Sequence, residues 1–269
     1  ADIITPYDMP WRVVMVGEKA VDLINNKQLI LNLNEPCRIP DTAFIRPGRA
    51  FRSGQLDDKS IRASIDFAAK FGLEYVELDA GWYGPEMQVG SSALQVAANR
   101  DFSMPDICAY AASKGIGIWL YVNQRALYNQ LDSILPLYKK WGVKGLKFGF
   151  VQVGGQQWTT WLHRAVEQCA AYGLMVDIHD EYRPTGWSRT YPNLMTQEGV
   201  RGNEEMPDAW HNTVLPFTRY VAGPADYTLC YFNGRVKNTK AHQLAMAVVY
   251  YSPLQFLFWY DKPDAYRGE

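Results

Sequence analysis

Five carboxylates fall within one short stretch of the sequence, between residues 180 and 205. Three arginines and several aromatic residues are interleaved with them, which is unlike the solvent-exposed charge run that usually explains such a cluster. Converging acids can hold a hard cation such as Ca²⁺ through oxygen ligands, and one of them can act as a general acid if its surroundings raise its pKa. Crowded carboxylates with aromatic walls are also typical of glycoside hydrolysis. The acids are Asp180, Glu181, Glu198, Glu204 and Glu205.

Polar residues also stand at the ends of four predicted strands. They are Asp79, Asn123, Lys147 with the nearby Gly149, and His179 just before the carboxylates. Strand ends meet solvent in any case, so one polar residue there means little. Four strands in succession with such ends favour a polar mouth at the carboxyl end of a barrel, where the chemistry of such folds is found.

A recurring local pattern would position these residues: an amphipathic helix ends in a small or basic residue and glycine, and an apolar strand begins almost at once. Glycine supplies the left-handed helix cap, and alternating helices and strands indicate a parallel sheet. About eight strands in roughly 250 residues predict an α/β fold, the (β/α)₈ TIM barrel. A doubly wound sheet is the alternative, but no glycine-rich phosphate loop follows the first strand. The expected strands are Phe44–Ile45, Tyr75–Asp79, Ile118–Asn123, Leu146–Phe150, Leu174–His179, Leu194–Thr196, Tyr227–Cys230 and Leu254–Trp259.

The start of the chain does not follow this pattern. Trp11–Val16 is typical of a β-strand and is followed by Ala20–Ile30 and a loop that contains proline. We therefore divide the chain into a short N-terminal β lead-in over residues 1–40, which would be the edge of a missing β-sandwich, and a catalytic barrel over residues 41–269.

Composition narrows the class of protein. A hydrophobic content of 48% excludes intrinsic disorder, and a net charge of −1 argues against nucleic acid as a partner. The longest apolar stretch, Leu244–Tyr260, is interrupted by polar residues and proline, so we expect no membrane insertion. No signal peptide opens the chain, and four dispersed cysteines indicate neither a zinc site nor a disulfide framework.

Nine tryptophans and seventeen tyrosines are the unusual feature of the composition. Such residues can line a sugar site, although they fill cores more often. Most of them, such as Trp119, Trp141 and Phe256, are expected in the barrel core. A smaller set is expected at the mouth, namely Trp82, Tyr83, Tyr182, Trp187 and Tyr191.

Several motifs resemble glycoside hydrolase family 97, the exo-acting α-glucosidases and α-galactosidases of bacteria. The resemblance covers nearly the whole chain and is strongest at Arg189-Thr-Tyr-Pro-Asn193 and in the run from Glu198 to Glu204. It implies hydrolysis of oligosaccharides or other α-glycosides that end in glucose or galactose, in the periplasm or cell envelope of a bacterium. It also implies an N-terminal β-sandwich and a C-terminal β-domain in the same polypeptide, both missing from this chain.

The resemblance assigns roles to individual residues. Glu204 is similar to the general acid that protonates the leaving glycosidic oxygen. Asp180 and Glu198 look like carboxylates associated with a Ca²⁺ cofactor, and a further ligand would come from the missing N-terminal domain. The positions that match substrate binding are Asp79, Trp82, Asn123, Lys147 and His179.

The second catalytic carboxylate departs from the family pattern. Retaining members have an Asp nucleophile at the position of Gly149, and inverting members have a Glu base at the position of Asn123. Because glycine cannot act as a nucleophile, we expect inversion, which needs a base about 6.5–9.5 Å from the acid with water between them. Asp180 is the preferred base and Glu181 the alternative.

Three other interpretations stay open. The barrel could bind sugar without turnover because neither base nor nucleophile is at its usual position. The scaffold could support another reaction, such as elimination or attack by an external nucleophile. Alternatively, the carboxylates could bind a calcium ion that only stabilises the fold. The choice between glucose and galactose, and the linkage, are not decided by the sequence.

Overall fold

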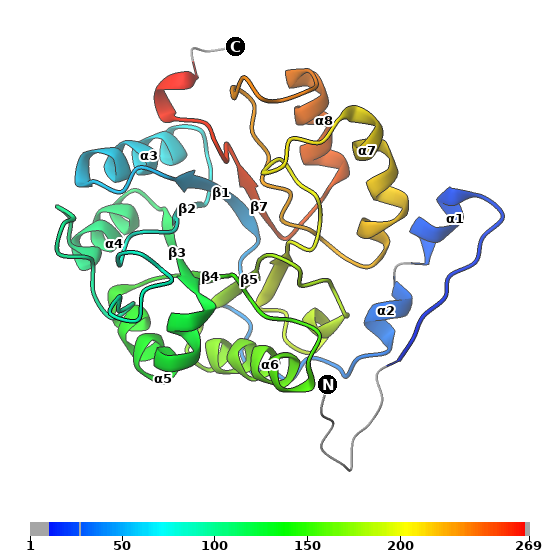
Figure 1. Cartoon of the computed structure of the whole chain (residues 1–269), viewed down its shortest axis with the longest axis horizontal. Helices are drawn as coiled ribbons and strands as arrows, with labels where there is room; N and C mark the ends of the chain where they lie inside the picture. The colour runs from blue at the N-terminus through cyan, green and yellow to red at the C-terminus, as the bar shows by residue number, and fades with distance from the viewer. Residues whose placement is uncertain (1–10, 27, 267–269) are drawn as a thin grey trace.

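The computed structural model describes residues 11–26 and 28–266, which contain a nearly closed barrel of parallel strands with helices around it (Figure 1). Seven strands pair in the order β6-β5-β4-β3-β2-β1-β7. This arrangement confirms the predicted (β/α)₈-type barrel. The strands are β1 (Gly48–Ser53), β2 (Tyr75–Leu78), β3 (Gly117–Asn123), β4 (Gly145–Gly149), β5 (Met175–Ile178), β6 (Leu194–Gln197) and β7 (Leu254–Leu257).

The helices follow the capping signals in the sequence. Asp57 accepts a hydrogen bond from the backbone N–H of Ser60 at the start of α3, and Gly142 ends α5 with a φ of 86°. The α-helices are α1 (Ala20–Asn25), α2 (Gln28–Asn32), α3 (Asp58–Lys70), α4 (Met104–Ser113), α5 (Gln124–Trp141), α6 (Gln156–Ala171), α7 (Ala209–Val214) and α8 (Lys240–Val249). The 3₁₀ turns are η1 (Trp187–Arg189), η2 (Leu215–Phe217), η3 (Arg219–Val221) and η4 (Pro263–Ala265).

An extended segment bridges the two edge strands of the sheet. The backbone N–H of Asp226 donates to Gln197 of β6 (3.1 Å), and that of Leu229 donates to Phe256 of β7 (3.1 Å). Thr228 has a φ of 56°, which interrupts a regular strand. The expected strand Tyr227–Cys230 is therefore wrong as a regular strand, although this segment lies where the eighth strand of a barrel would close the sheet.

Two strand predictions near the start of the chain are also wrong. The first strand is β1 rather than Phe44–Ile45, and its glycine and two arginines obscure the apolar pattern of a strand. Trp11–Val16 is irregular instead of a strand, since nothing in residues 11–26 and 28–266 pairs with it. Trp11, Val14 and Val16 are exposed, so the apolar pattern there has no core to cover among the described residues.

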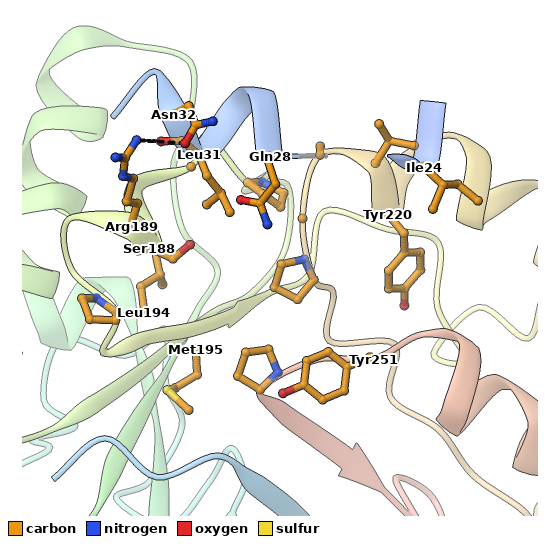
Figure 2. Close-up of a pocket in the computed structure, with 18 of the residues that line it drawn as sticks. Ile24, Gln28, Leu31, Asn32, Ser188, Arg189, Leu194, Met195, Tyr220 and Tyr251 are labelled. Atoms are coloured by element: carbon orange, nitrogen blue, oxygen red, sulfur yellow. Dashed lines mark hydrogen bonds between the residues drawn. The ribbon is translucent and has the colours of Figure 1, made fainter. Parts of the chain in front are cut away.

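The lead-in helices α1 and α2 lie outside the ring of barrel helices (Figure 1). Asn34 and Arg189 join this lead-in to the barrel through hydrogen bonds to the carbonyls of Thr185 (2.9 Å) and Leu31 (3.2 Å). A groove of about 780 Å³ lies between them, lined by Leu31, Leu194, Tyr220 and Tyr251 among others (Figure 2). None of the predicted site residues lines this groove, so we do not assign it to the substrate.

Two hydrophobic clusters stabilise the fold. The larger one fills the space between the sheet and the surrounding helices, and the smaller one, with Tyr75, Trp119, Met175 and Phe256, fills the barrel interior. Gly145 has a specific role there, because a Cβ atom at its position would meet the Trp119 ring at 2.5 Å. None of the helices in the described ranges combines the length and apolar character needed to cross a bilayer.

Candidate active site

Charged side chains are buried inside the barrel next to the smaller apolar cluster. Strand register pairs Arg52 with Glu77 and Lys147 with Asp177, and the last three are almost fully buried. Burial raises the pKa of Glu77 and of Asp177 well above the ordinary range, which favours the protonated form of both. A neutral form lowers the cost of burying two acids whose carboxylate oxygens have no hydrogen-bond partner.

Two other buried acids are ionised because cations face them. Burial opposes ionisation of Asp79, but Lys147 and Arg52 outweigh it and lower its pKa. Arg52 Nε lies 2.5 Å from Asp79 Oδ2. Asp226 is held ionised in the same way, since its hydrogen bond with His179 outweighs burial and lowers its pKa. Asp79 therefore sits in an ion pair at the end of β2, with little freedom to act as a base.

His179 bridges two carboxylates at the end of β5. Its Nδ1 lies 3.0 Å from Glu198 Oε2, and its Nε2 lies 3.0 Å from Asp226 Oδ2. Burial and the nearby Lys147 disfavour a charged ring, but the two carboxylates outweigh them and raise the pKa of His179 well above its ordinary value. A raised pKa favours the charged ring, in which both nitrogens can donate to the two carboxylates.

Glu204 lies beside this bridge, in the loop that follows β6. One oxygen of Glu204, one of Glu198 and a ring nitrogen of His179 lie within 4.8 Å of one another. Burial raises the pKa of Glu204, with Glu198 and Asp226 adding to the effect and Lys147 and His179 opposing it. A partly buried carboxyl with a raised pKa is what a general acid requires.

The loop that carries Glu198 and Glu204 is fixed from both sides. The Arg219 guanidinium donates to the carbonyls of Gln197 (2.9 Å), Glu198 (2.7 Å) and Gly199 (2.9 Å). Asn203 donates through its backbone to Tyr227 (3.0 Å) and through its side chain to Gln243 (2.7 Å). These contacts hold the two acids without using their carboxylates.

Asp180 directly follows the bridging histidine. Its backbone N–H donates to Glu198 Oε2 (2.6 Å), and its own Oδ2 accepts from the backbone of Val151 (3.0 Å). Burial raises the pKa of Asp180, with Glu198 adding to the shift. Asp180 is partly exposed at the mouth and can take up a proton there, whereas Glu181 is exposed and makes no contact with Glu198 or Glu204 that we observe.

Lys147 and Trp259 form the wall opposite these acids. The Lys147 ammonium lies 3.6 Å from the centroid of a Trp259 ring, which also stacks on His179 at 5.9 Å. Arg52 lies over the same tryptophan at 4.7 Å. Arg52 and Trp259 also line a cavity of about 550 Å³ between the end of β1, α3 and the segment 259–264 that follows β7. Trp259 thus connects an accessible cavity with the buried cations.

A second catalytic carboxylate is found at neither of its two family positions, Gly149 and Asn123. A Cβ atom at Gly149 would overlap the ring of Tyr121 on the neighbouring strand. Asn123 is buried, and its Oδ1 accepts the backbone N–H of Arg125 as the cap of α5 (2.9 Å). Neither position therefore offers a base.

Strained backbone is concentrated on the catalytic face of the barrel. Phe150 and Asp180 follow β4 and β5 with φ values of 52° and 61°, and Phe258 follows β7 with a φ of 62°. Met206 and Thr228 lie near Glu204 and Asp226 with φ values of 49° and 56°. Such conformations cost about 1–3 kcal/mol each and are often found at functional sites.

The carboxylates at the mouth offer the oxygen ligands that a hard cation prefers. Glu198 and Glu204 bring oxygens within 4.8 Å of each other, and Asp180 is bonded to Glu198 through its backbone. Ca²⁺ takes about 6–8 oxygen ligands, so these residues can supply part of its shell. A ring nitrogen of His179 belongs to the same group, and its two nitrogens lie 3.0 Å from Glu198 and from Asp226.

Four of the five aromatic residues expected at the mouth are buried, and the fifth is partly buried. Trp82 is fully buried and donates to the carbonyl of Tyr121 (2.7 Å), so its place in the substrate pocket stays a prediction. Tyr83 is buried and accepts from the backbone of Asn123 (3.0 Å). Tyr182 and Tyr191 are buried as well, and Trp187 stacks on His163 of α6 at 4.3 Å.

Four of the predicted site residues lie close together in the structure, namely Lys147, His179, Glu198 and Glu204. Two others, Asp79 and Asp180, lie at the edges of this group. Sequence reasoning missed Arg52, Glu77, Asp177, Asp226 and Trp259. An indication was available for two of them, Glu77 and Asp177. Charged residues alternate with apolar ones at Glu77 and Asp79 and at Asp177 and His179, which is the period of side chains that face a barrel interior.

Comparison with known proteins identifies the family of this chain. The family model for glycoside hydrolase 97 matches residues 42–200, and the model for the N-terminal region of family 97 glycosyl hydrolases matches residues 1–36. The retaining alpha-galactosidase of Bacteroides thetaiotaomicron is 32% identical over 303 residues, covering 100% of this chain and 44% of the relative. A probable retaining alpha-galactosidase of Streptomyces bingchenggensis is 33% identical over 270 residues, covering 96% of this chain and 42% of the relative.

Solved structures give the same result. A glycoside hydrolase family 97 enzyme from Pseudoalteromonas sp. strain K8, in complex with acarbose, is 28% identical with a TM-score of 0.78. That match covers 93% of this chain and 46% of the solved one. The chain thus spans less than half the length of the relatives it matches. On the family-model match over the barrel, the chain belongs to glycoside hydrolase family 97.

Proposed function

We propose that this chain carries the catalytic barrel of a hydrolase that removes terminal α-linked galactose or glucose from oligosaccharides, with Glu204 as the general acid. The observation that carries the proposal is the setting of Glu204. Its carboxyl is partly buried beside Glu198, and its pKa is raised by burial. Two relatives named as alpha-galactosidases support the substrate class.

Glu204 would donate its proton to the glycosidic oxygen as the bond to the anomeric carbon breaks. Lys147, ionised because nearby acids outweigh its burial, would bind hydroxyl oxygens of the sugar. His179 donates to Glu198 and holds that carboxylate in place beside the acid. Proton donation of this kind contributes about 10²- to 10⁴-fold to a rate.

The proposal includes inversion at the anomeric carbon. Tyr121 fills the space beside Gly149, so a covalent intermediate at that position has no carboxylate to form it. Glu198 is within 4.8 Å of Glu204, which is short of the roughly 6.5–9.5 Å that leaves room for a water. Asp180 is therefore the proposed base, and in stereochemistry this chain would differ from the relatives that are named as retaining.

The proposal also includes a Ca²⁺ ion held by Glu198 and Asp180. The ion would orient sugar hydroxyls or water through its open coordination positions. Glu204 is left out of this ligand set because a bound cation would favour its ionised form and remove the proton that it must donate. Ligands from a further domain of the same polypeptide would complete the shell.

Binding of sugar without turnover is the second candidate function. The packing of Tyr121 against Gly149 favours it, since the usual position of the second carboxylate is closed to any side chain. The test below separates the two, because a binding barrel gives no product in the wild type.

The compartment and the further domains are also part of the proposal. A chain that covers 44% of a relative is consistent with additional N- and C-terminal β-domains in the same polypeptide. We propose that this protein acts in the periplasm or cell envelope. Fractionation of cells that express the complete gene tests this, and recovery only in the cytoplasm would overturn it.

Hydrolysis of a p-nitrophenyl α-glycoside and of an α-linked disaccharide, both as the galactose and the glucose form, tests the acid. Glu204→Gln should lower kcat/KM for the disaccharide by about 10²- to 10⁴-fold. The loss should be smaller for the nitrophenyl substrate, whose leaving group needs less protonation. Glu205→Gln is the matched control, because Glu205 is exposed and pairs with Arg201. Equal activity of the two variants would refute the assignment of Glu204.

A further inference from the structure

Three aromatic side chains gather on the outer surface of the barrel, between α5 and α6. Tyr128 of α5 lies 5.3 Å from Trp158 and 5.7 Å from Trp161, measured between ring centroids. The two tryptophans are one helical turn apart, with centroids 6.3 Å apart. Tyr128 keeps 48% of its surface exposed, and both tryptophans are partly exposed.

The core explains only one of these residues. Trp161 packs against the larger hydrophobic cluster, whereas Tyr128 and Trp158 lie outside it. Further along the same two helices the contact is polar, since Gln168 of α6 donates to Asp132 of α5 at 3.0 Å. Exposed aromatic groups that the core does not use are candidates for a binding surface.

This surface lies on the catalytic face of the barrel. Helix α5 begins directly after β3, and α6 begins after the short loop that follows Gly149. That loop contacts the site, because the backbone of Val151 donates to Asp180 Oδ2. Phe150 in the same loop is 60% exposed. One loop therefore connects the carboxylates with the first turn of α6, where Trp158 is located.

We propose that Tyr128, Trp158 and Trp161 form an outer carbohydrate-binding site, which holds the sugar rings of an oligosaccharide beyond the residue that is cleaved. The flat apolar face of a pyranose can pack on an aromatic ring while its hydroxyls reach polar groups at the edge. Asn129, Gln157 and Arg164 neighbour these residues along α5 and α6 and are exposed, so they can supply such groups. The choice of a sugar as the ligand rests on the proposed function.

A protein partner fits this surface less well. A stable protein interface buries about 800 Å² on each side, and its core is depleted in charged residues. Here the exposed residues that neighbour the three rings along α5 and α6 include two amides and an arginine, which is unlike the charge-poor core of such an interface. A second copy of the chain on this surface is an outcome that the test can detect.

Calorimetric titration of maltopentaose and stachyose into the full chain tests the inference. The Glu204→Gln background prevents turnover, so binding is measured independently of hydrolysis. Trp158→Ala and Tyr128→Ala should each weaken binding of at least one of the two sugars by about tenfold, which corresponds to about 1.4 kcal/mol. Trp158→Phe should retain most of the affinity because it keeps a ring.

Trp210→Ala is the matched control, because Trp210 is a tryptophan of α7 that is 77% exposed and lies outside the cluster. Wild-type affinity in the Trp158 and Tyr128 variants would overturn the outer site, and so would absence of binding of both sugars. A dimer that dissociates in these variants, measured by light scattering, would instead assign the surface to self-association. If Trp158-dependent binding is found but the wild type hydrolyses nothing, the proposed hydrolase fails and the outer site stands.

Discussion

The ring of Tyr121 lies against Gly149 on the neighbouring strand and fills the space that a side chain at position 149 would need. Residue 149 is at the end of β4, on the side of the strand that carries Lys147. The chain therefore closes, by packing, the position at which its family resemblance implies a nucleophile. This relationship is the structural reason for proposing inversion.

The packing predicts a penalty for a carboxylate at position 149. Gly149→Asp should lower the free energy of unfolding by about 1–3 kcal/mol, because the new side chain overlaps the Tyr121 ring. The double variant Gly149→Asp/Tyr121→Ala should lose less stability than the sum of the losses in the two single variants, because truncation of Tyr121 makes room for the new side chain. Urea denaturation of the four proteins measures this coupling.

Gly155→Asp is the control for that series. Gly155 is the cap residue of α6, and a Cβ atom there would meet nothing closer than 3.8 Å. An aspartate at a helix cap is neutral or stabilising. If the losses of Gly149→Asp and Tyr121→Ala add up in the double variant, the proposed steric overlap between the two positions is contradicted.

Buried Glu77 predicts a dependence of stability on pH. Its native pKa is raised well above 4.5 by burial, so the native state keeps a proton that the unfolded chain releases. This group therefore lowers stability as pH rises from about 4.5 toward its native pKa, and its effect is constant above that pKa. Glu77→Gln should make the fall of unfolding free energy with pH less steep.

Urea denaturation between acidic and alkaline pH checks the Glu77 prediction. The exposed Glu205, changed to Gln, serves as the control and should leave the slope as it is in the wild type. An unchanged slope in Glu77→Gln would show that Glu77 is ionised in the native state.

Calcium binding predicts a specific response to a chelator. Treatment with EGTA should lower both the midpoint of thermal unfolding and the rate of α-glycoside hydrolysis, and added Ca²⁺ should restore both. Glu198→Gln should abolish the response because it removes a proposed ligand. Glu181→Gln is the comparison from the same stretch, since Glu181 is exposed. Retention of the Ca²⁺ response in Glu198→Gln would remove Glu198 from the ligand set.

Strands β2 to β5 could be predicted from the sequence because each follows a helix that ends near glycine, and each has an apolar run. Strand β1 could not, since its inward Ala50 and Arg52 give it no apolar alternation. The segment around Thr228 was predicted as a strand, and its irregular backbone could not be foreseen. Its positive φ accompanies tertiary hydrogen bonds on both sides of the segment.

The acids of the site could be predicted from their clustering in the sequence and from the family resemblance, but their ionisation states could not. The pKa shifts of Glu77 and His179 depend on burial and then on Lys147, Asp79 and Asp226, which come from other strands and loops. The contacts of the aromatic residues could not be predicted for a similar reason. The segment that contains Trp187 folds back onto α6, where Trp187 stacks on His163.

The anomeric form of the first sugar released tests the central claim most directly. Proton NMR can follow wild-type hydrolysis of a p-nitrophenyl α-galactoside or α-glucoside before mutarotation mixes the anomers. A hydrolase with Glu204 as acid, water as nucleophile and no carboxylate at position 149 releases the β-anomer first. Initial release of the α-anomer would contradict this account, because it would require a covalent intermediate on a carboxylate that we have not assigned.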